Sequence, residues 1–255
     1  MNEQTTATKC GFVAIVGATN AGKSTLVNQA VGTKISIVTH KVQTTRSRVL
    51  GVMIEDNAQI VLVDPPGIFD PRRRLDRAMI QAAWQGAADA DVVALIVDAK
   101  RGATEDVLGI IEKLADIKAP KLLVLNKIDL LERSRLLDLT AKLNASGIFQ
   151  ETLMVSALNG DGVRDLISQF TRHMPDSPWL FPEDQLTDMP NRLLAAEITR
   201  EKAFLRLHQE LPYSLTVETD TWEERKDGSV KIDQTIFVTR DGHKGIVIGK
   251  SGATL

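Results

Sequence analysis

The sequence predicts an α/β protein in which helices cover both faces of a mostly parallel sheet, followed by a smaller α+β domain. Short apolar, β-branched runs alternate with segments of helical periodicity. A proline-rich stretch at 174–190 then separates this alternation from a region with the order helix, strand, strand. With 255 residues, 43% of them hydrophobic, the chain can bury one full core and a second, smaller one.

Six apolar runs are expected to form the strands of the first domain. They lie at 12–16, 47–54, 59–63, 92–97, 121–125 and 152–155. Because helical segments separate most of these runs, their strands should be parallel. The gap between 47–54 and 59–63 has the length of a hairpin turn, so one of these two strands should be antiparallel to the rest.

The helices of the first domain are expected between these strands. Their predicted ranges are about 23–31, 76–88, 104–116, 133–145 and 162–172. Thr104 is a suitable N-cap for the third, and Gly147 should close the fourth. The stretch 174–190 contains four prolines and cannot continue a helix. We therefore expect a first domain at 1–173, a linker at 174–190 and a second domain at 191–255.

A phosphate-binding pattern, G-x-x-x-x-G-K-[ST], lies between the first strand and the first helix. Its glycines let several backbone N–H groups point inward, its lysine reaches the outer phosphates, and its serine hydroxyl can ligate Mg²⁺. The N-terminal end of the helix favours the same anion. The expected binding residues are Gly17, Ala18, Thr19, Asn20, Ala21, Gly22, Lys23, Ser24 and Thr25. This arrangement is typical of a P-loop NTPase domain.

Two later motifs indicate that the base is guanine. Residues 126–129 follow a predicted strand and match N-K-x-D, and residues 156–158 match the S-A-[KL] loop that supports guanine O6 through a backbone N–H. The Asp129 carboxylate can accept hydrogen bonds from guanine N1–H and the 2-amino group, which adenine does not offer. The residues expected around the base are Asn126, Lys127, Asp129, Ser156, Ala157 and Leu158. GTP and GDP are the predicted ligands.

Residues 64–67 match D-x-x-G, in which Asp64 can hold Mg²⁺ through water and the Gly67 N–H can contact the γ-phosphate. The segment 43–46, Gln-Thr-Thr-Arg, lies where a first switch loop would supply a threonine to Mg²⁺. We favour Thr45 over Thr44, the alternative being a solvated loop with strand-forming character. The expected metal ligands are Ser24, Thr45 and Asp64, and the expected catalytic residues are Lys23, Asn20, Thr45 and Gly67.

Hydrolysis of GTP should be slow without help. Ile68 stands where many regulatory GTPases place a water-orienting glutamine, and isoleucine cannot polarise water. Asn20 resembles the asparagine of potassium-stimulated GTPases, which adds K⁺ to GTP, GDP and Mg²⁺ as a candidate cofactor. The alternative is that Asn20 only tolerates a turn conformation.

The order of these motifs, followed by a C-terminal domain, resembles the Era family of bacterial GTPases over nearly the whole chain. The most diagnostic part is 246–252, Ile-Val-Ile-Gly-Lys-Ser-Gly, which resembles the I-G-x-x-G signature of a KH RNA-binding domain. A helix at 191–208 and strands at 213–222 and 230–239 precede it, in the order of a type II KH domain. The resemblance implies a Ras-like GTPase domain that hydrolyses GTP, with a KH-like domain that binds 16S rRNA during assembly of the 30S subunit.

RNA is expected at the loop formed by Gly249, Lys250, Ser251 and Gly252. Its small residues let an RNA backbone approach, and Lys250 offers a phosphate contact. The sequence stops at Leu255, where the next KH helix should begin, so we expect the KH-like domain to be incomplete and its strands partly uncovered. Residues 191–255 hold ten basic and ten acidic side chains, which predicts a modest electrostatic affinity for RNA.

The cysteine content favours a reducing cytoplasm, and we expect a monomer. Cys10 is the single cysteine and cannot form an intramolecular disulfide, and no secretory signal opens the sequence. Since no apolar run approaches the ~18 residues of a membrane span, any association with the inner membrane should be peripheral.

Two other functions stay open at this point. The protein could be a GTP-dependent regulator of protein or membrane-surface interactions that binds no RNA. It could also be a P-loop kinase or ATPase, although Asn126 and Asp129 argue against that class.

Overall fold

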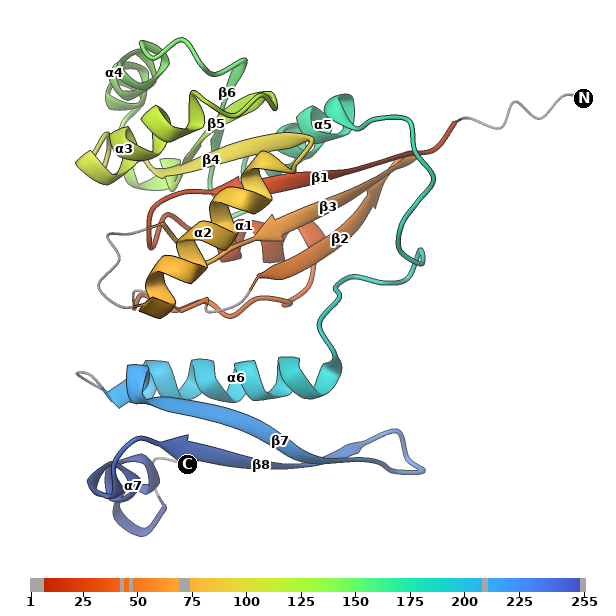
Figure 1. The fold of residues 1–255 in the computed structure, drawn as a ribbon, viewed down its shortest axis with the longest axis vertical. Helices are drawn as coiled ribbons and strands as arrows, with labels where there is room; N and C mark the ends of the chain where they lie inside the picture. Colours follow the sequence, from red (N-terminus) through yellow and green to blue (C-terminus); the bar gives the residue numbers. More distant parts are fainter. Residues whose placement is uncertain (1–6, 42–43, 46–47, 69–73, 208–210, 253–255) are drawn as a thin grey trace, which may run out of the picture. The chain divides into compact units, whose positions relative to one another are not determined.

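The computed structural model describes residues 7–41, 44–45, 48–68, 74–207 and 211–252. The chain divides into two compact units, which are coloured by sequence in Figure 1. The first comprises Met1–Ser36 and Thr45–Asp188, and the second comprises Ile37–Thr44 and Met189–Leu255. The second unit thus takes in a short segment from the middle of the first.

A six-stranded sheet forms the centre of the first unit. The strands are β1 (Lys9–Val16), β2 (Val49–Glu55), β3 (Ala58–Asp64), β4 (Val92–Asp98), β5 (Lys121–Asn126) and β6 (Glu151–Val155). Their order is β2-β3-β1-β4-β5-β6, and β2 alone pairs antiparallel, with β3. Asp56 makes the turn between β2 and β3 at φ +55°, a left-handed conformation that aspartate tolerates. The predicted strands and the antiparallel pair are confirmed.

Helices cover both faces of this sheet. They are α1 (Lys23–Val31), α2 (Arg74–Ala88), α3 (Glu105–Leu114), α4 (Arg133–Asn144) and α5 (Val163–His173). The helices α1 and α5 pack together over one face, whereas α2, α3 and α4 contribute to one apolar cluster on the other. Figure 1 shows α2 in front of the sheet and α1 behind it. All seven residues of β4 are buried, which explains why its sequence is a continuous apolar run.

The parallel strands bring the sequence motifs to one edge of the sheet. β1, β3, β4, β5 and β6 all run in the same direction, so their carboxyl ends meet at one edge. The phosphate loop follows β1, the D-x-x-G turn follows β3, and the two base motifs follow β5 and β6. Ligands of open α/β sheets bind at this edge.

Most of the predicted linker lies along the first unit. Residues 174–188, the edge segment, belong to that unit and contain no helix. Cys10 N donates to Pro175 O at 3.1 Å, and Val52 N donates to Leu186 O at 2.9 Å. The edge segment therefore satisfies backbone groups along the sheet, including the otherwise open edge of β2.

Gln59 anchors the edge segment. Its side chain is fully buried in β3; Oε1 accepts from Leu180 N at 2.9 Å and Phe181 N at 3.0 Å, and Nε2 donates to Phe181 O at 2.8 Å. Cys10 Sγ also donates to Gln59 Oε1, at 3.6 Å, and burial raises the pKa of this thiol. One amide group thus replaces the hydrogen bonds that these backbone groups would make with water.

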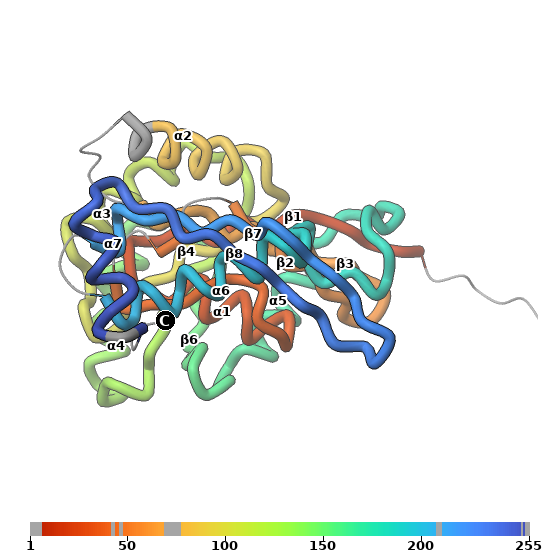
Figure 2. Tube along the Cα trace, turned by 90° about the horizontal axis from the view of Figure 1, so that it is seen from below, coloured from red at the N-terminus to blue at the C-terminus, as the bar shows by residue number. Residues whose placement is uncertain are grey.

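The second unit is a helix packed on a long hairpin, followed by a short helix, as Figure 2 shows from below. Its elements are α6 (Asn191–Arg206), the 3-10 turn Leu211–Ser214, β7 (Leu215–Glu224), β8 (Val230–Val238), α7 (Asp241–Ile248) and the turn Lys250–Gly252. β7 and β8 are antiparallel, and Gly228 takes φ +81° in their turn. A small core joins α6, β7 and α7 through residues such as Ala196, Leu215 and Val247.

The second unit differs from the sequence expectation at one helix. We predicted α6, β7 and β8 but not α7, in which Gly242 and Gly245 lower the helix propensity. On β8, Val230, Ile232 and Phe237 are each more than a third exposed.

We expect Gln59→Ala to release the edge segment. The change leaves the Leu180 and Phe181 amides without their acceptor, which should lower the free energy of unfolding by roughly 2–4 kcal/mol. Urea denaturation measures this loss, and limited proteolysis should show faster cleavage within 174–188. The exposed Gln85→Ala serves as the control and should change neither; equal effects of the two variants would contradict the anchoring role.

Candidate nucleotide-binding site

The phosphate loop needs glycine at two positions. Gly22 has φ +94° and caps α1, and a Cβ there would lie 2.3 Å from Asn126 Nδ2. A Cβ on Gly17 would lie 2.4 Å from Ile96 O. Any side chain at either position would push the loop away from β4 or β5. Asn20 also has a left-handed backbone, with φ +63°.

Lys23 is buried and aimed back at the loop. Its side chain is 7% exposed, and Nζ donates to Gly17 O at 3.1 Å and to Ala18 O at 2.9 Å. Burial lowers the pKa of Lys23 to about 8, although the charge of Asp64 opposes this change. The charged form of Lys23 is therefore destabilised by burial, and an anionic ligand would stabilise it.

Ser24, Thr45 and Asp64 form a set of oxygen ligands. Asp64 Oδ2 accepts from Ser36 Oγ at 2.9 Å, whereas Oδ1 is buried and accepts no hydrogen bond from the described residues. Ser24 Oγ and Thr45 Oγ1 lie 3.2 Å apart. Burial raises the pKa of Asp64, and the Ser24 hydroxyl, the Lys23 ammonium and the Ser36 hydroxyl oppose the rise.

This set fits Mg²⁺, which takes one or two carboxylates and completes its shell with phosphate oxygens and water. The buried and unpartnered Oδ1 of Asp64 is the observation that supports a cation here, because such an oxygen is costly unless a positive group compensates it. The described residues hold no cluster of three or more His, Cys, Asp or Glu side chains. The oxygen ligands available here are the Asp64 carboxylate and the hydroxyls of Ser24 and Thr45, which the phosphates of a nucleotide would supplement.

The Asn126 side chain joins three loops. It is almost completely buried at the end of β5, and Nδ2 donates to Ala21 O in the phosphate loop at 2.9 Å. Its Oδ1 accepts from Lys127 N at 2.8 Å and from Ala157 N at 3.0 Å. One amide thereby fixes the phosphate loop, the N-K-x-D turn and the S-A-L loop relative to one another.

Lys127 extends the same connection. Its backbone is left-handed at φ +65°, and Nζ donates to Asn20 O at 2.8 Å and to Asp98 Oδ2 at 2.6 Å. Asp98 ends β4 and is the register partner of Asn126 on β5. The aliphatic part of Lys127 consequently bridges from the base motif to the phosphate loop.

The residues predicted to bind the guanine base include both exposed and buried side chains. Asp129 is exposed in the 3-10 turn Ile128–Leu130, where its carboxylate is accessible to a ligand. Ser156 is fully buried, and its Oγ has no hydrogen-bond partner among the described residues. Leu158 is 77% exposed. These positions suit a purine that enters from solvent and meets polar groups at its far edge.

The D-x-x-G turn closes on the phosphate loop. A Cβ on Gly67 would lie 3.0 Å from Lys23 Nζ and 3.1 Å from Thr19 Cα, so the backbone comes as near as glycine allows. Ile68 N donates to Gly17 O at 3.1 Å, and the Ile68 side chain packs into the core cluster beneath the sheet edge. Ile68 is thus a core residue.

The predicted RNA loop lies in the second unit, directly after α7. Gly249 caps α7 with φ +73° and ψ 175°, and Gly252 has φ +81°, both conformations that favour glycine. Lys250 is exposed between them. The Ser251 side chain lies outside the described residues.

Family models match both parts of the chain. A model described as a 50S ribosome-binding GTPase matches residues 12–127, and a model described as a KH domain matches residues 210–255. Two proteins called GTPase Era, from Dinoroseobacter shibae and Sinorhizobium medicae, are 59% and 57% identical to this chain. Both alignments cover 100% of this chain, and 83% and 84% of the relatives. The chain belongs to the Era family of GTPases.

Solved structures of Era give the same result for the fold. A structure of Era in complex with MgGDPNP and nucleotides 1506–1542 of 16S ribosomal RNA has a TM-score of 0.90 at 38% identity, covering 97% of this chain and 84% of the other. A single-residue variant of Aquifex aeolicus Era bound to GDP.AlF4⁻ has the same score and identity, covering 96% and 84%. The predicted Ras-like fold with a C-terminal KH domain is confirmed, and a kinase or ATPase is excluded.

The structure of this Era-family chain brings most of the predicted site residues together. The phosphate loop, Asp64, Gly67 and the two base motifs lie at one sheet edge, and Thr45 reaches Ser24. Thr25 is half-buried within α1. Gln43 and Arg46 of the predicted switch pattern lie outside the described residues.

Sequence reasoning missed three residues of the site. Ser36 donates to Asp64, Asp98 pairs with Lys127, and Arg101 Nη1 donates to Thr19 O at 3.2 Å. Asp98 could have been found, because an acidic residue at the end of β4 stands beside the end of β5. Ser36 and Arg101 lie in loops whose sequences carry no comparable signal.

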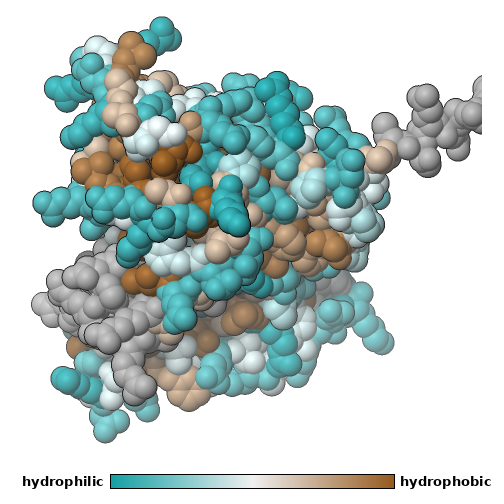
Figure 3. Space-filling model, turned by 45° about the horizontal axis from the view of Figure 1, so that its top comes forward, coloured by the Kyte–Doolittle hydropathy of each residue, from teal (hydrophilic) through white to brown (hydrophobic). Residues whose placement is uncertain are grey.

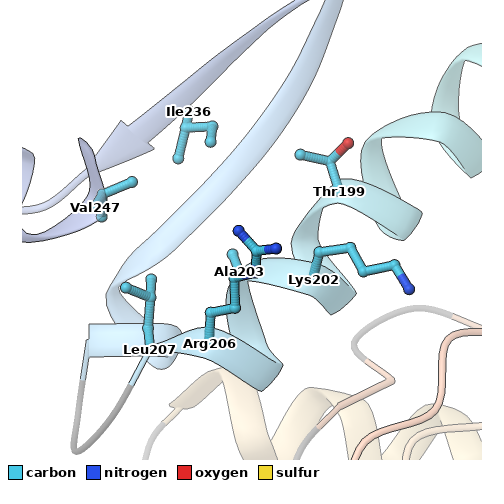
Figure 4. A pocket seen from close by; sticks show the side chains of 7 residues that line it. All are labelled: Thr199, Lys202, Ala203, Arg206, Leu207, Ile236 and Val247. Carbon is cyan, nitrogen blue, oxygen red and sulfur yellow. The ribbon is translucent and has the colours of Figure 1, made fainter. Parts of the chain in front are cut away.

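Two apolar hollows are not assigned to the nucleotide site. In the second unit, a groove of about 180 Å³ lies between α6, β8 and α7, with Ala203, Leu207, Ile236 and Val247 as its apolar lining (Figure 4). In the first unit, a hollow of about 390 Å³ beside α4 is lined mainly by apolar side chains such as Leu136. Figure 3 shows that hydrophobic residues reach the molecular surface in patches among the hydrophilic ones. No helix among the described residues has the length and hydropathy of a membrane span.

We expect nucleotide binding to take up protons near pH 8. The pKa of Lys23 is about 8 because burial disfavours its charge, and phosphate should raise it, so binding of GDP should take up about half a proton at that pH. Calorimetry in two buffers of different ionisation enthalpy measures the uptake. The exposed Lys142→Met should keep it, and an uptake of zero in the unaltered protein would contradict the buried ammonium.

Proposed function

We propose that this Era-family GTPase is a nucleotide-controlled switch that binds 16S rRNA through its second unit during assembly of the 30S ribosomal subunit. The observation that carries the proposal is the combination, in one chain, of a guanine-specific site with a glycine-flanked loop after α7. The solved complex of Era with nucleotides 1506–1542 of 16S rRNA, 38% identical to this chain, supports it.

We assign nucleotide binding to the phosphate loop and the two base motifs. The backbone of 17–22 and the Lys23 ammonium would hold the phosphates, and Asp129 would accept from the guanine N1–H and 2-amino groups. Asn126 and Lys127 act indirectly, because their hydrogen bonds go to Ala21, Asn20 and neighbouring backbone. Ser156, Ala157 and Leu158 would border the base.

Mg²⁺ would be held by Ser24, Thr45 and Asp64, and when bound it would neutralise charge on the phosphates. During hydrolysis Lys23 would stabilise the developing negative charge, while Gly67 would offer its N–H to the γ-phosphate. Because Ile68 is apolar and packs into the core, it cannot orient a water molecule, which supports a slow intrinsic rate. Asn20 could add K⁺ by resemblance, although its left-handed backbone also fits the plain turn explanation.

RNA would bind at the loop Gly249–Gly252. The two glycines keep Cβ atoms away from an approaching sugar-phosphate backbone, and the exposed Lys250 can contact one phosphate. Since residues 191–255 carry as many acidic as basic side chains, shape and base contacts should contribute more than bulk charge. We further propose a cytoplasmic monomer whose contact with the inner membrane, where it occurs, is peripheral.

We expect Asp129→Asn to change the base preference. Asparagine presents a donor where the carboxylate presents an acceptor, so guanosine nucleotides should lose and xanthosine nucleotides should gain affinity, each by at least about tenfold. Competition of GDP, XDP and ADP against a fluorescent nucleotide measures this. Asp116→Ala, an exposed change on another loop, should leave the preference for GDP intact; an unchanged preference in Asp129→Asn would remove this residue from the base site.

The RNA proposal is tested with an oligonucleotide of 16S nucleotides 1506–1542 and a non-hydrolysable GTP analogue. We expect Gly252→Asp to weaken binding by at least about tenfold while nucleotide affinity stays constant, because a carboxylate in the loop repels phosphate. Fluorescence anisotropy measures both affinities. Gly228→Asp is the matched control, since that glycine has the same φ of +81°, lies in the β7–β8 turn and has open space around it.

Two results would contradict the proposal in different ways. Equal RNA affinity of Gly252→Asp and the unaltered protein would place the RNA elsewhere. Absence of RNA binding in both nucleotide states would favour the alternative, a GTP-dependent regulator of protein or membrane-surface interactions.

A further inference from the structure

A segment between α1 and β2 is structurally part of the second unit. Residues Ile37–Thr44 separate from their neighbours in sequence and group with Met189–Leu255. Within the second unit, three positions of this segment contact the single helix α6. The segment is thus fastened to α6 near its start, in its middle and at its end.

Arg200 fastens the end of the segment. Its side chain is only 2% exposed, and Nη2 donates to Thr44 O at 2.7 Å. Nε donates to Glu197 Oε1 at 2.8 Å, and the guanidinium lies 5.1 Å from the centre of the Phe204 ring. Separating this buried guanidinium from its partners would leave a buried charge unpaired, which costs free energy.

Glu201 and Lys41 fasten the start and the middle. Val38 N donates to Glu201 Oε1 at 2.9 Å, and Glu201 is buried. Lys41 Nζ donates to Phe204 O and Leu207 O, two carbonyls at the C-terminal end of α6. A cation at that end also interacts favourably with the helix dipole.

The residues on either side of the segment belong to the nucleotide site. Ser36, immediately before it, donates to Asp64 Oδ2 at 2.9 Å. Thr45, immediately after it, lies 3.2 Å from Ser24 through their hydroxyl oxygens. Asp64 and Ser24 are the same groups that suit Mg²⁺, so a bound nucleotide with its cation would compete for both contacts.

We infer that Arg200, Glu201 and Lys41 are positioning residues that make α6 follow the segment Ile37–Thr44 and so transmit the nucleotide state to the second unit. The inference rests on the proposed function only in its RNA readout. Because both flanks of the segment contact the nucleotide site and its interior is fixed to α6, a shift of Ser36 or Thr45 must either move α6 or break buried charged contacts.

The test measures amide hydrogen exchange of residues 191–207 in the full chain with GDP and with a non-hydrolysable GTP analogue. In the unaltered protein we expect the exchange rates of α6 to differ at least about fivefold between the two states. Glu201→Ala and Lys41→Met should reduce the difference to less than twofold, while affinity for either nucleotide changes by less than about threefold. Since Arg200→Ala endangers folding by leaving Glu197 unpaired, these two variants carry the test.

Two controls separate this role from a general loss of structure. Glu201→Gln keeps an acceptor for Val38 N and should restore at least half of the difference. Lys202→Met removes a charge from an exposed position of the same helix and should behave as the unaltered protein. Loss of the difference in Lys202→Met as well would show that any change in α6 suffices, and the inference would fall.

The RNA readout distinguishes failure of this inference from failure of the proposed function. We expect the ratio of RNA affinities between the two nucleotide states to approach one in Glu201→Ala and Lys41→Met. Identical exchange of α6 in both states of the unaltered protein overturns the inference whatever RNA does. Nucleotide-dependent exchange that the variants abolish, without RNA binding in any state, supports the inference and overturns the proposed function.

Discussion

The nucleotide site depends on the side-chain amide of Asn126. Its donor and acceptor groups make three hydrogen bonds, with Ala21, Lys127 and Ala157, and these residues belong to loops that follow three different strands. The amide is buried, so water does not compete for these bonds. Because β5 is an interior strand of the sheet and wholly buried, the anchor itself is well packed, and three separate loops acquire one geometry.

At the phosphate end of the site, burial destabilises two charged side chains. Lys23 and Asp64 are both charged groups in a poorly solvated place, and each finds only part of the partners that would stabilise its charge. Such an arrangement costs stability in the folded protein, and that cost is offset when an anion meets the ammonium and a cation meets the carboxylate. The strongest interactions of the site are therefore reserved for the ligand.

The sequence predicted secondary structure that depends on neighbouring residues, but it did not predict contacts between residues far apart in the chain. β4 and α1 were predicted within one residue, because a buried apolar run and a phosphate-loop motif that leads into a helix carry their own signals. α7 was missed because its glycines contradict its conformation. Ser36 and Arg200 were missed for another reason: their partners, Asp64 and Thr44, lie far along the chain, and no local pattern encodes such a contact.

The edge segment also shortens the linker that leads to the second unit. If residues 174–190 were a flexible linker, their ends would lie roughly 20–25 Å apart on average. Hydrogen bonds hold this stretch as far as Asp188, and α6 begins at Asn191 after the stiff Pro190. The link from Asp188 to α6 is therefore only Met189 and Pro190, and the chain also crosses between the units on either side of Ile37–Thr44, so three short covalent crossings, rather than one long linker, join the two units.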